Sequence, residues 1–184
     1  MEIINTSIIG AFVIKPKMFK DERGIFIKTF HKDFFLKNGL SGDISENFYS
    51  VSKKNVIRGM HFQIPPHDHV KIVYVTRGSI SDVILDIRMG SPTYGKYVIQ
   101  ELSAENGLIV YIPKGCAHGF SSPEDESCVA YLHSTPYVAE CDTGIRYDSF
   151  GLDWGIVNPV ISKRDQNLIK FEKFDSPFIF REDM

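Results

Sequence analysis

The sequence has little of what marks a membrane, nucleic-acid-binding or disulfide-stabilised protein. Its 184 residues carry a formal net charge of −2, so no basic surface argues for nucleic acid or an anionic membrane as a partner. No apolar run approaches the ~18 residues that span a bilayer, and we expect no signal peptide because the first residues lack a basic region followed by a long apolar run. The cysteines, Cys116, Cys128 and Cys141, are odd in number and lack C-x-x-C spacing, which favours free thiols in a reducing compartment. These absences predict a cytoplasmic protein.

Helical periodicity is also scarce, and strand patterns dominate. Short apolar or alternating segments that predict strands span residues 10–16, 24–30, 55–63, 70–78, 80–88, 95–103, 107–115, 128–134 and 144–149. Turn residues separate most of them at roughly 8–12 residue spacing, which is typical of a sandwich or barrel. Only residues 32–40 and 162–174 favour short helices. We expect a single all-β domain over residues 1–184, a Greek-key or jelly-roll barrel with a few short helices and a ligand-sized mouth.

The stretch RGMHFQIPPHDHVK, residues 58–71, is rich in histidine. Together with GLIVYIPKGCAHGF, which places His118 just after a turn, RGMHFQ resembles the two motifs of the cupin barrel, also called a double-stranded β-helix. Metal-binding cupins carry H-x-H in the first motif, whereas here Phe62 takes the second position and cannot bind a metal. His61 and Gln63 share one face of the expected strand. The H-x-H of His67 and His69 follows two prolines, so we interpret it as a solvated turn and expect no metal.

Longer motifs narrow the resemblance to one family. DERGIF, VIRGMHFQIPP, VKIVYVTRGSISDVILDIRMGSPTYGKY, LSAENGLIVYIPKGCAHGF, VAYLHSTPY, GIRYD, LDW and SKRDQN occur between about residues 8 and 167. In order and spacing they resemble the dTDP-4-dehydrorhamnose 3,5-epimerase family. The resemblance implies a metal-free, cofactor-free cupin that acts on nucleotide-linked 4-keto-6-deoxyhexoses in deoxysugar synthesis for O-antigen or other polysaccharides. It also implies a homodimer in which N-terminal strands cross to the partner's sheet.

The expected chemistry requires a base, a group that holds an enolate, and an acid. A 4-keto group acidifies the hydrogens on C3 and C5, and an imidazole that titrates near neutral pH suits the base, which we expect to be His61. The resemblance gives Asp165 the role of orienting that imidazole. It places the Lys71 ammonium near the developing oxyanion and makes Tyr131 the acid on the other face of the sugar.

Other residues are expected to bind the substrate. Arg58 and Arg23 suit a pyrophosphate, because a guanidinium can grip phosphate through two hydrogen bonds. The resemblance places Tyr137 near the same mouth, and Gln63 shares the face of His61. His118 either contacts the substrate or forms a hydrogen bond in the core.

The remaining polar residues have simpler interpretations. Asp86 and Arg88 are expected to form a structural ion pair. We interpret His31 and His133 as surface or packing residues.

The expected nucleotide pocket departs from the family pattern. Family members specific for dTDP sugars usually have a glutamate where Lys28 stands, and a Q-x-N-x-S run where this chain has Glu46, Phe48 and Ser50. These changes alter both charge and hydrogen bonding around the base, so we expect a CDP sugar first and a GDP sugar second as the substrate.

Two other functions stay open at this point. One is a 3,4-ketoisomerase of the same substrates, and the other is a non-catalytic sugar-binding cupin. The sequence also leaves open whether C3, C5 or both carbons are inverted.

Overall fold

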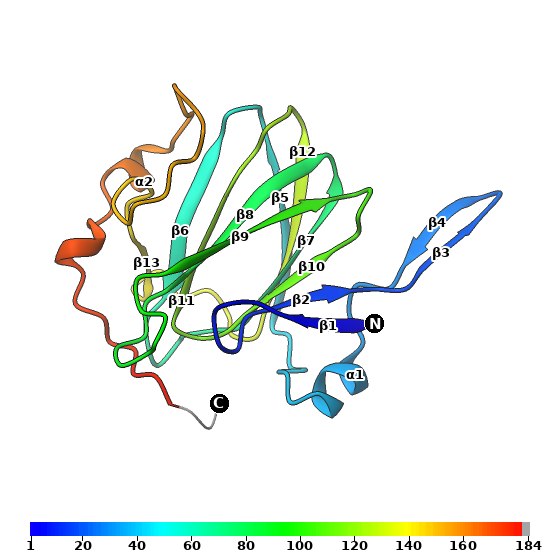
Figure 1. The fold of residues 1–184 in the computed structure, drawn as a ribbon, viewed down its shortest axis with the longest axis horizontal. Helices are drawn as coiled ribbons and strands as arrows, with labels where there is room; N and C mark the ends of the chain where they lie inside the picture. Colours follow the sequence, from blue (N-terminus) through cyan, green and yellow to red (C-terminus); the bar gives the residue numbers. More distant parts are fainter. Residues whose placement is uncertain (182–184) are drawn as a thin grey trace.

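The computed structural model describes residues 1–181, which form a barrel of two facing β-sheets (Figure 1). The strands of the larger sheet lie in the order β1 (Glu2–Asn5), β2 (Phe12–Lys15), β10 (Ile109–Ile112), β7 (Lys71–Arg77), β12 (Ser127–His133) and β5 (Glu46–Ser52). Those of the smaller sheet lie in the order β13 (Asp142–Gly144), β6 (Ile57–Gln63), β11 (Cys116–Ser121), β8 (Ser79–Asp86) and β9 (Tyr97–Ser103). The predicted all-β fold of cupin type is confirmed.

A third, separate element is the hairpin of β3 (Met18–Asp21) and β4 (Gly24–Ile27), which extends away from the barrel (Figure 1). Three short helical segments complete the structure: α1 (Lys32–Lys37), α2 (Lys163–Gln166) and the 3₁₀ turn η1 (Phe171–Lys173). No helix within residues 1–181 is long and apolar enough to cross a membrane.

The space between the sheets is filled by apolar side chains from alternate strand positions. Val73 and Val75 of β7 pack in one buried cluster with Ile84 of β8 and Phe120 of β11. Residues at every second position of a strand point to the same face, so the polar residues at the end of β7 and β12 share the face of this core. The barrel interior therefore changes from apolar to polar along the strands, and the polar end holds the candidate site.

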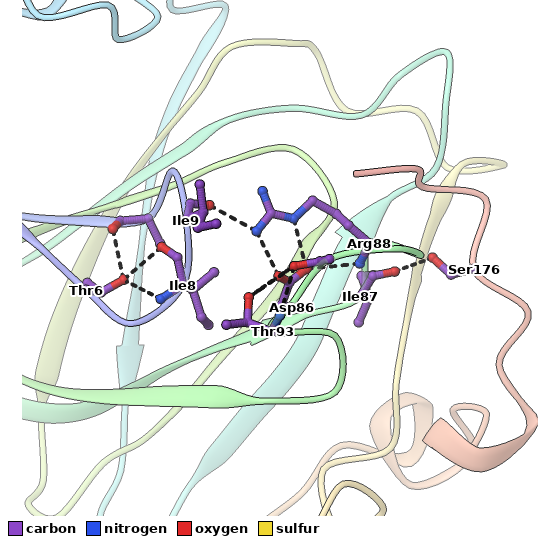
Figure 2. A network of polar contacts seen from close by, with 10 residues as sticks. Thr6, Ile8, Ile9, Asp86, Ile87, Arg88, Thr93 and Ser176 are labelled. Atoms are coloured by element: carbon purple, nitrogen blue, oxygen red, sulfur yellow. Dashed lines mark hydrogen bonds and ion pairs between the residues drawn. The ribbon is translucent and has the colours of Figure 1, made fainter. Parts of the chain in front are cut away.

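The predicted Asp86–Arg88 pair is confirmed, and it anchors the N-terminal turn (Figure 2). Arg88 Nε and Nη2 each donate to the Asp86 carboxylate over 2.8 Å, and a second Nη2 hydrogen bond reaches the carbonyl of Ile9 at 2.9 Å. Burial alone would raise the pKa of Asp86, but the hydrogen bonds from Arg88, Ser91 and Thr93 outweigh it and hold the pKa below its usual range. Removing one partner of such a buried pair typically costs about 3–5 kcal/mol.

Several predicted boundaries were wrong. The strand predicted at residues 144–149 lies earlier, at β13, and its pairing with β6 ends at Ile145, which exchanges two backbone hydrogen bonds with Met60. The helix predicted at 162–174 is split into α2 and η1, since Ile169 bridges to Ile145 between them. Strands β1, β3, β5 and β11 were not predicted individually; β5 begins with two polar residues followed by two aromatic ones, so it lacks strict alternation, and it lies at the edge of its sheet.

Candidate active site

A cavity of about 300 Å³ opens at the polar end of the barrel, between the two sheets. Most of the predicted site residues line it: Phe48, Arg58, His61, Gln63, Lys71, His118, Tyr131 and Tyr137. They come from β5, β6, β7, β11 and β12 and from the segment after β12. The strands of both sheets therefore position the site, and the loops add only its rim.

The predicted base and its orienting carboxylate are in contact. His61 Nε2 lies 2.7 Å from Asp165 Oδ1, and the His61 side chain keeps 27% of its surface exposed while that of Asp165 keeps 5%. The Ser162 hydroxyl accepts a hydrogen bond from the Asp165 N–H and so begins α2, which turns the carboxylate toward β6.

The protonation of this pair follows from its surroundings. Burial would raise the pKa of Asp165, but hydrogen bonds from His61 and the Gly59 N–H outweigh it, so the pKa lies below its usual range and the carboxylate is charged. A carboxylate only accepts hydrogen bonds. His61 Nε2 must therefore donate to it, which leaves Nδ1 as the nitrogen that can take a proton.

Lys71 begins β7, and its side chain is buried at the base of the cavity. Its ammonium Nζ donates to the carbonyl oxygen of His61 over 2.8 Å. Burial lowers the pKa of Lys71 from 10.5 to about 8, although Asp142 and Asp82 nearby partly oppose this shift. The group is thus charged at neutral pH and loses its charge in mildly alkaline solution.

Tyr131 on β12 faces the cavity from the opposite sheet to His61. Its hydroxyl lies 3.2 Å from the Ser50 hydroxyl, and burial raises the pKa of the phenol, so Tyr131 carries its proton at neutral pH. Phe48, the register partner of Tyr131 on β5, stacks on its ring with the centroids 4.9 Å apart. A protonated phenol held in this way suits a proton donor.

The sequence left open whether His118 contacts the substrate or forms a hydrogen bond in the core, and the structure shows the hydrogen bond. His118 Nε2 donates to Asp82 Oδ2 over 2.7 Å in the core, and the side chain also lines the cavity. Burial lowers the pKa of His118 even though Asp82 opposes the shift. His118 and His61 are register partners on β11 and β6, so two histidine–aspartate pairs lie side by side.

The mouth of the cavity holds other residues predicted to bind substrate. Arg58 lines it and is held by the Ser52 hydroxyl at 3.0 Å. Gln63 Oε1 accepts from the Val138 N–H, and its amide nitrogen donates to the carbonyls of His67 and Pro136, which fixes the loops on either side. Glu46 does not line the cavity itself.

Glu46 instead supports a residue that does. Its Oε1 accepts from the backbone N–H of Tyr137 at 2.9 Å, and the Tyr137 ring is exposed at the mouth. Glu46 is also the register partner of His133 on β12.

The structure does not bring Arg23 and Lys28 to this cavity. Arg23 lies at the tip of the β3–β4 hairpin, where it pairs with Asp21 at 2.6 Å and its side chain is 83% exposed. Lys28 follows β4 and lines a separate small hollow beside His31 and Phe34. The hairpin points away from the barrel (Figure 1), and neither Arg23 nor Lys28 lines the cavity of its own chain.

The interpretation of His67 and His69 as a solvated turn was wrong for His69, and that of His133 as a surface or packing residue missed its place in the cavity wall. His69 and His133 are both buried, stack with their ring centroids 4.2 Å apart, and line the cavity. Sequence distance concealed the pair, because it forms only when β7 and β12 lie side by side. No group of three or more histidine, cysteine or acidic residues with metal-site geometry occurs in the described part of the chain.

Other cavity residues had no signal in the sequence. Asp142 and Arg164 both line the cavity and form an ion pair at 2.7 Å that joins β13 to α2. Asp82, the partner of His118, does not line the cavity itself; it lies on β8, where nothing in the sequence distinguished it from a solvent-facing carboxylate. Contacts between elements far apart in the sequence, which the sequence does not reveal, bring each of them to the site.

Comparison with known proteins gives a consistent result. A sequence profile described as dTDP-4-dehydrorhamnose 3,5-epimerase matches residues 5–173. A dTDP-4-dehydrorhamnose 3,5-epimerase from Methanothermobacter thermautotrophicus is 40% identical over 169 residues, covering 89% of this chain and 91% of the relative. A dTDP-4-dehydrorhamnose 3-epimerase from Streptomyces niveus is 34% identical over 163 residues, covering 87% of this chain and 79% of the relative.

A solved structure agrees with these sequences. A dTDP-6-deoxy-D-glucose-3,5-epimerase from Legionella pneumophila, in complex with dTDP-4-keto-L-rhamnose, superposes with a TM-score of 0.90 at 34% identity and covers 95% of this chain and 94% of that one. The likeness therefore extends over nearly the whole chain.

Proposed function

The chain belongs to the dTDP-4-dehydrorhamnose 3,5-epimerase family of isomerases, and we propose that it inverts C3, C5 or both in a nucleotide-linked 4-keto-6-deoxyhexose. His61 Nδ1 removes the proton from the carbon next to the ketone, and the electrons of that C–H bond move onto the ketone oxygen. Tyr131 returns a proton to the opposite face of the same carbon. His61 then releases the proton that it removed, and the Tyr131 phenolate takes up a proton, both by exchange with solvent. The enzyme thereby returns to its starting state.

The observation that carries the proposal is the arrangement around the cavity. His61 with Asp165 lies on one sheet, Tyr131 with Ser50 on the other, and the buried Lys71 ammonium lies at the base. A base and an acid on opposite walls suit inversion, since the proton must leave and return from different faces. The Lys71 charge stabilises the enolate oxygen in a poorly hydrated cavity, where such an interaction is stronger than in water.

The substrate class is supported by the site and by the relatives. The Legionella pneumophila epimerase binds dTDP-4-keto-L-rhamnose. Arg58 at the mouth provides a guanidinium for the pyrophosphate, and Tyr137 provides an exposed ring beside it. Because the residues of this chain supply a base, a cation and an acid, the reaction as proposed needs neither a metal nor a cofactor.

A homodimer completes the proposal. The exposed faces of the β3–β4 hairpin carry Phe19, Ile25 and Phe26, each more than half exposed, which is unfavourable in an isolated chain. If the hairpin packs on a second copy, as the family resemblance implies, Arg23 and Lys28 reach the partner's cavity and contact its nucleotide. We place this single-domain enzyme in the cytoplasm, in the synthesis of deoxysugars for O-antigen or other polysaccharides.

Proton exchange tests the function directly. The protein is incubated in D2O with CDP-, dTDP- and GDP-linked 4-keto-6-deoxyhexoses, and NMR identifies the carbons that acquire deuterium. We expect exchange and inversion at C3, C5 or both, with the carbonyl remaining at C4. A carbonyl that moves to C3 would identify a ketoisomerase, and binding without exchange would identify a sugar-binding protein.

A further inference from the structure

Two buried histidines in the cavity wall have no role in the proton transfer described above. His69 lies in the loop before β7, and His133 ends β12 directly opposite Lys71 in the sheet register. Their rings stack with centroids 4.2 Å apart and planes 18° apart, and the residues keep only 8% and 9% of their surface exposed. Both line the same cavity as His61 and Tyr131.

Each ring has a buried nitrogen without a partner. Within residues 1–181, no hydrogen-bond partner lies near Nε2 of His69 or Nε2 of His133. Native proteins pair nearly all buried polar atoms, because an unpaired one loses its hydrogen bonds to water without replacement. Two such atoms on adjacent rings in a cavity wall are therefore best explained by a ligand that pairs with them.

The surroundings determine what each nitrogen offers. Burial, together with the nearby Lys71 ammonium, lowers the pKa of His69 to about 3 and that of His133 to about 2, so both rings are neutral. The Gln63 amide nitrogen lies 3.1 Å from His69 Nδ1. A neutral imidazole carries one ring proton, so the Nε2 of each histidine can make one hydrogen bond, either as donor or as acceptor.

We propose that the His69–His133 pair binds one ring hydroxyl of the sugar in the sugar nucleotide. A hydroxyl both accepts and donates hydrogen bonds, so it can pair with a neutral imidazole nitrogen in either tautomer, whereas a ketone or phosphate oxygen only accepts. The position also fits. His133 lies two residues from Tyr131 on β12 and opposite Lys71 in the sheet register, and Tyr131 and Lys71 are the groups proposed to act at the reacting carbons. This inference rests on the proposed function and adds a sugar-binding role for two residues.

Substitution by phenylalanine tests the pair, because it keeps a stacked ring and removes the nitrogens. For His69→Phe and His133→Phe we expect KM to rise about tenfold with kcat little changed, as for the loss of a hydrogen bond made equally in the ground and transition states. His67→Phe is the matched control, since His67 lies in the same loop outside the cavity wall. An unchanged KM in both variants would overturn the inference.

A second measurement on the unmodified protein does not depend on how the variants fold. Nitrogen-15 NMR of the imidazoles should show neutral rings for His69 and His133 at neutral pH, and both signals should shift on adding dTDP-glucose or CDP-glucose. The nucleoside diphosphates dTDP and CDP, which lack the hexose, serve as controls and should leave both signals unchanged. If the sugar nucleotides shift His61 but neither His69 nor His133, the pair binds no sugar hydroxyl.

The two proposals fail in different ways. An enzyme that exchanges deuterium normally while His69 and His133 give no response contradicts the hydroxyl site alone. A protein that exchanges deuterium into none of the 4-keto sugar nucleotides contradicts the proposed function, and the sugar as the occupant of this site is then rejected with it.

Discussion

At the scale of single residues, the chemistry depends on groups that the surrounding structure brings into one protonation state. His61 and Asp165 are 104 residues apart in the chain, and their hydrogen bond makes Nδ1 the basic nitrogen. Burial keeps the Tyr131 phenol protonated and brings the pKa of Lys71 close to neutrality. Each of these effects leads to a measurable expectation.

Replacing the base should abolish proton exchange. For His61→Asn we expect the rate of deuterium incorporation to fall by about 10²–10⁴, the usual contribution of a general base. Asp165→Asn should give a smaller loss, because the imidazole remains but is no longer oriented by a carboxylate. His67→Asn is the matched control and should leave the rate unchanged. Exchange at the parental rate in His61→Asn would place the base elsewhere.

The pH dependence should report Lys71. Its ammonium is less stable in the buried site than in water, so its pKa is about 8 rather than 10.5; the group is charged below pH 8 and neutral above. If the charge holds the enolate, kcat/KM should fall by about tenfold per pH unit above this pKa. Lys71→Arg should lower the rate but remove this decline, since a guanidinium stays charged. A decline that persists in Lys71→Arg would assign it to another group.

The nucleotide preference should follow the changed residues of β5. Phe48 and Glu46 stand where the dTDP-specific family pattern has amides, so we expect a CDP-linked 4-keto-6-deoxyhexose to have the higher kcat/KM. The predicted preference is about tenfold or more, because a mismatched base leaves polar edges unpaired. Phe48→Asn should reduce that preference. A preference of this size for dTDP would show that these two substitutions do not select the base.

At the scale of elements, the register of three strands arranges the cavity in rows. On β5, β12 and β7, Glu46, His133 and Lys71 are opposite one another, and so are Phe48, Tyr131 and Val73 in the next row. Side chains directly opposite in neighbouring strands lie on the same face of the sheet. A shift of one residue in this register would turn the acid, the cation and the histidine pair away from the substrate at once.

The β3–β4 hairpin should hold the dimer together. Phe26→Asp places a charge on its exposed apolar surface, so we expect a shift from dimer to monomer by light scattering, together with loss of activity. Arg23→Ala provides the comparison, because it should raise KM about tenfold and leave the dimer intact, as expected for a lost phosphate contact. A parental protein that is monomeric and fully active at micromolar concentration would contradict both expectations.

At the scale of the whole molecule, the barrel holds the reacting groups on strands of two packed sheets and leaves only the rim to loops. The Asp86–Arg88 pair ties the N-terminal turn to the smaller sheet through the carbonyl of Ile9 (Figure 2). The hairpin then leaves the barrel at a defined position. A rigid scaffold of this kind keeps the base and acid on opposite walls, which inversion requires.

Removing metals should leave the molecule unchanged. Phe62 interrupts the ligand pattern in the first cupin motif, and the proposed reaction uses only side chains of the protein. We expect exhaustive chelation to alter neither the deuterium-exchange rate nor the Tm. A stoichiometric transition metal in freshly purified protein, with activity lost on its removal and regained on its return, would contradict this prediction.

The sequence by itself determined the class of fold and the candidate groups for the proposed reaction. Alternation and turn spacing predict an all-β barrel because period-two patterns bury one face of each strand, and RGMHFQ and SKRDQN identify His61 and Asp165 through family resemblance. Local patterns also predicted the helix at α1. These features depend on residues close together in the chain.

Only the tertiary structure decided which distant residues meet. It stacks the rings of His69 and His133, and it pairs His118 with Asp82 and Arg164 with Asp142. It also leaves Arg23 and Lys28 outside the cavity of their own chain. Whether a histidine lies in a solvated turn or in the cavity wall depends on strands paired across the barrel, and burial, hydrogen bonding and pKa all follow from that pairing. A linear pattern records the alternation within each strand but not the strand that lies beside it.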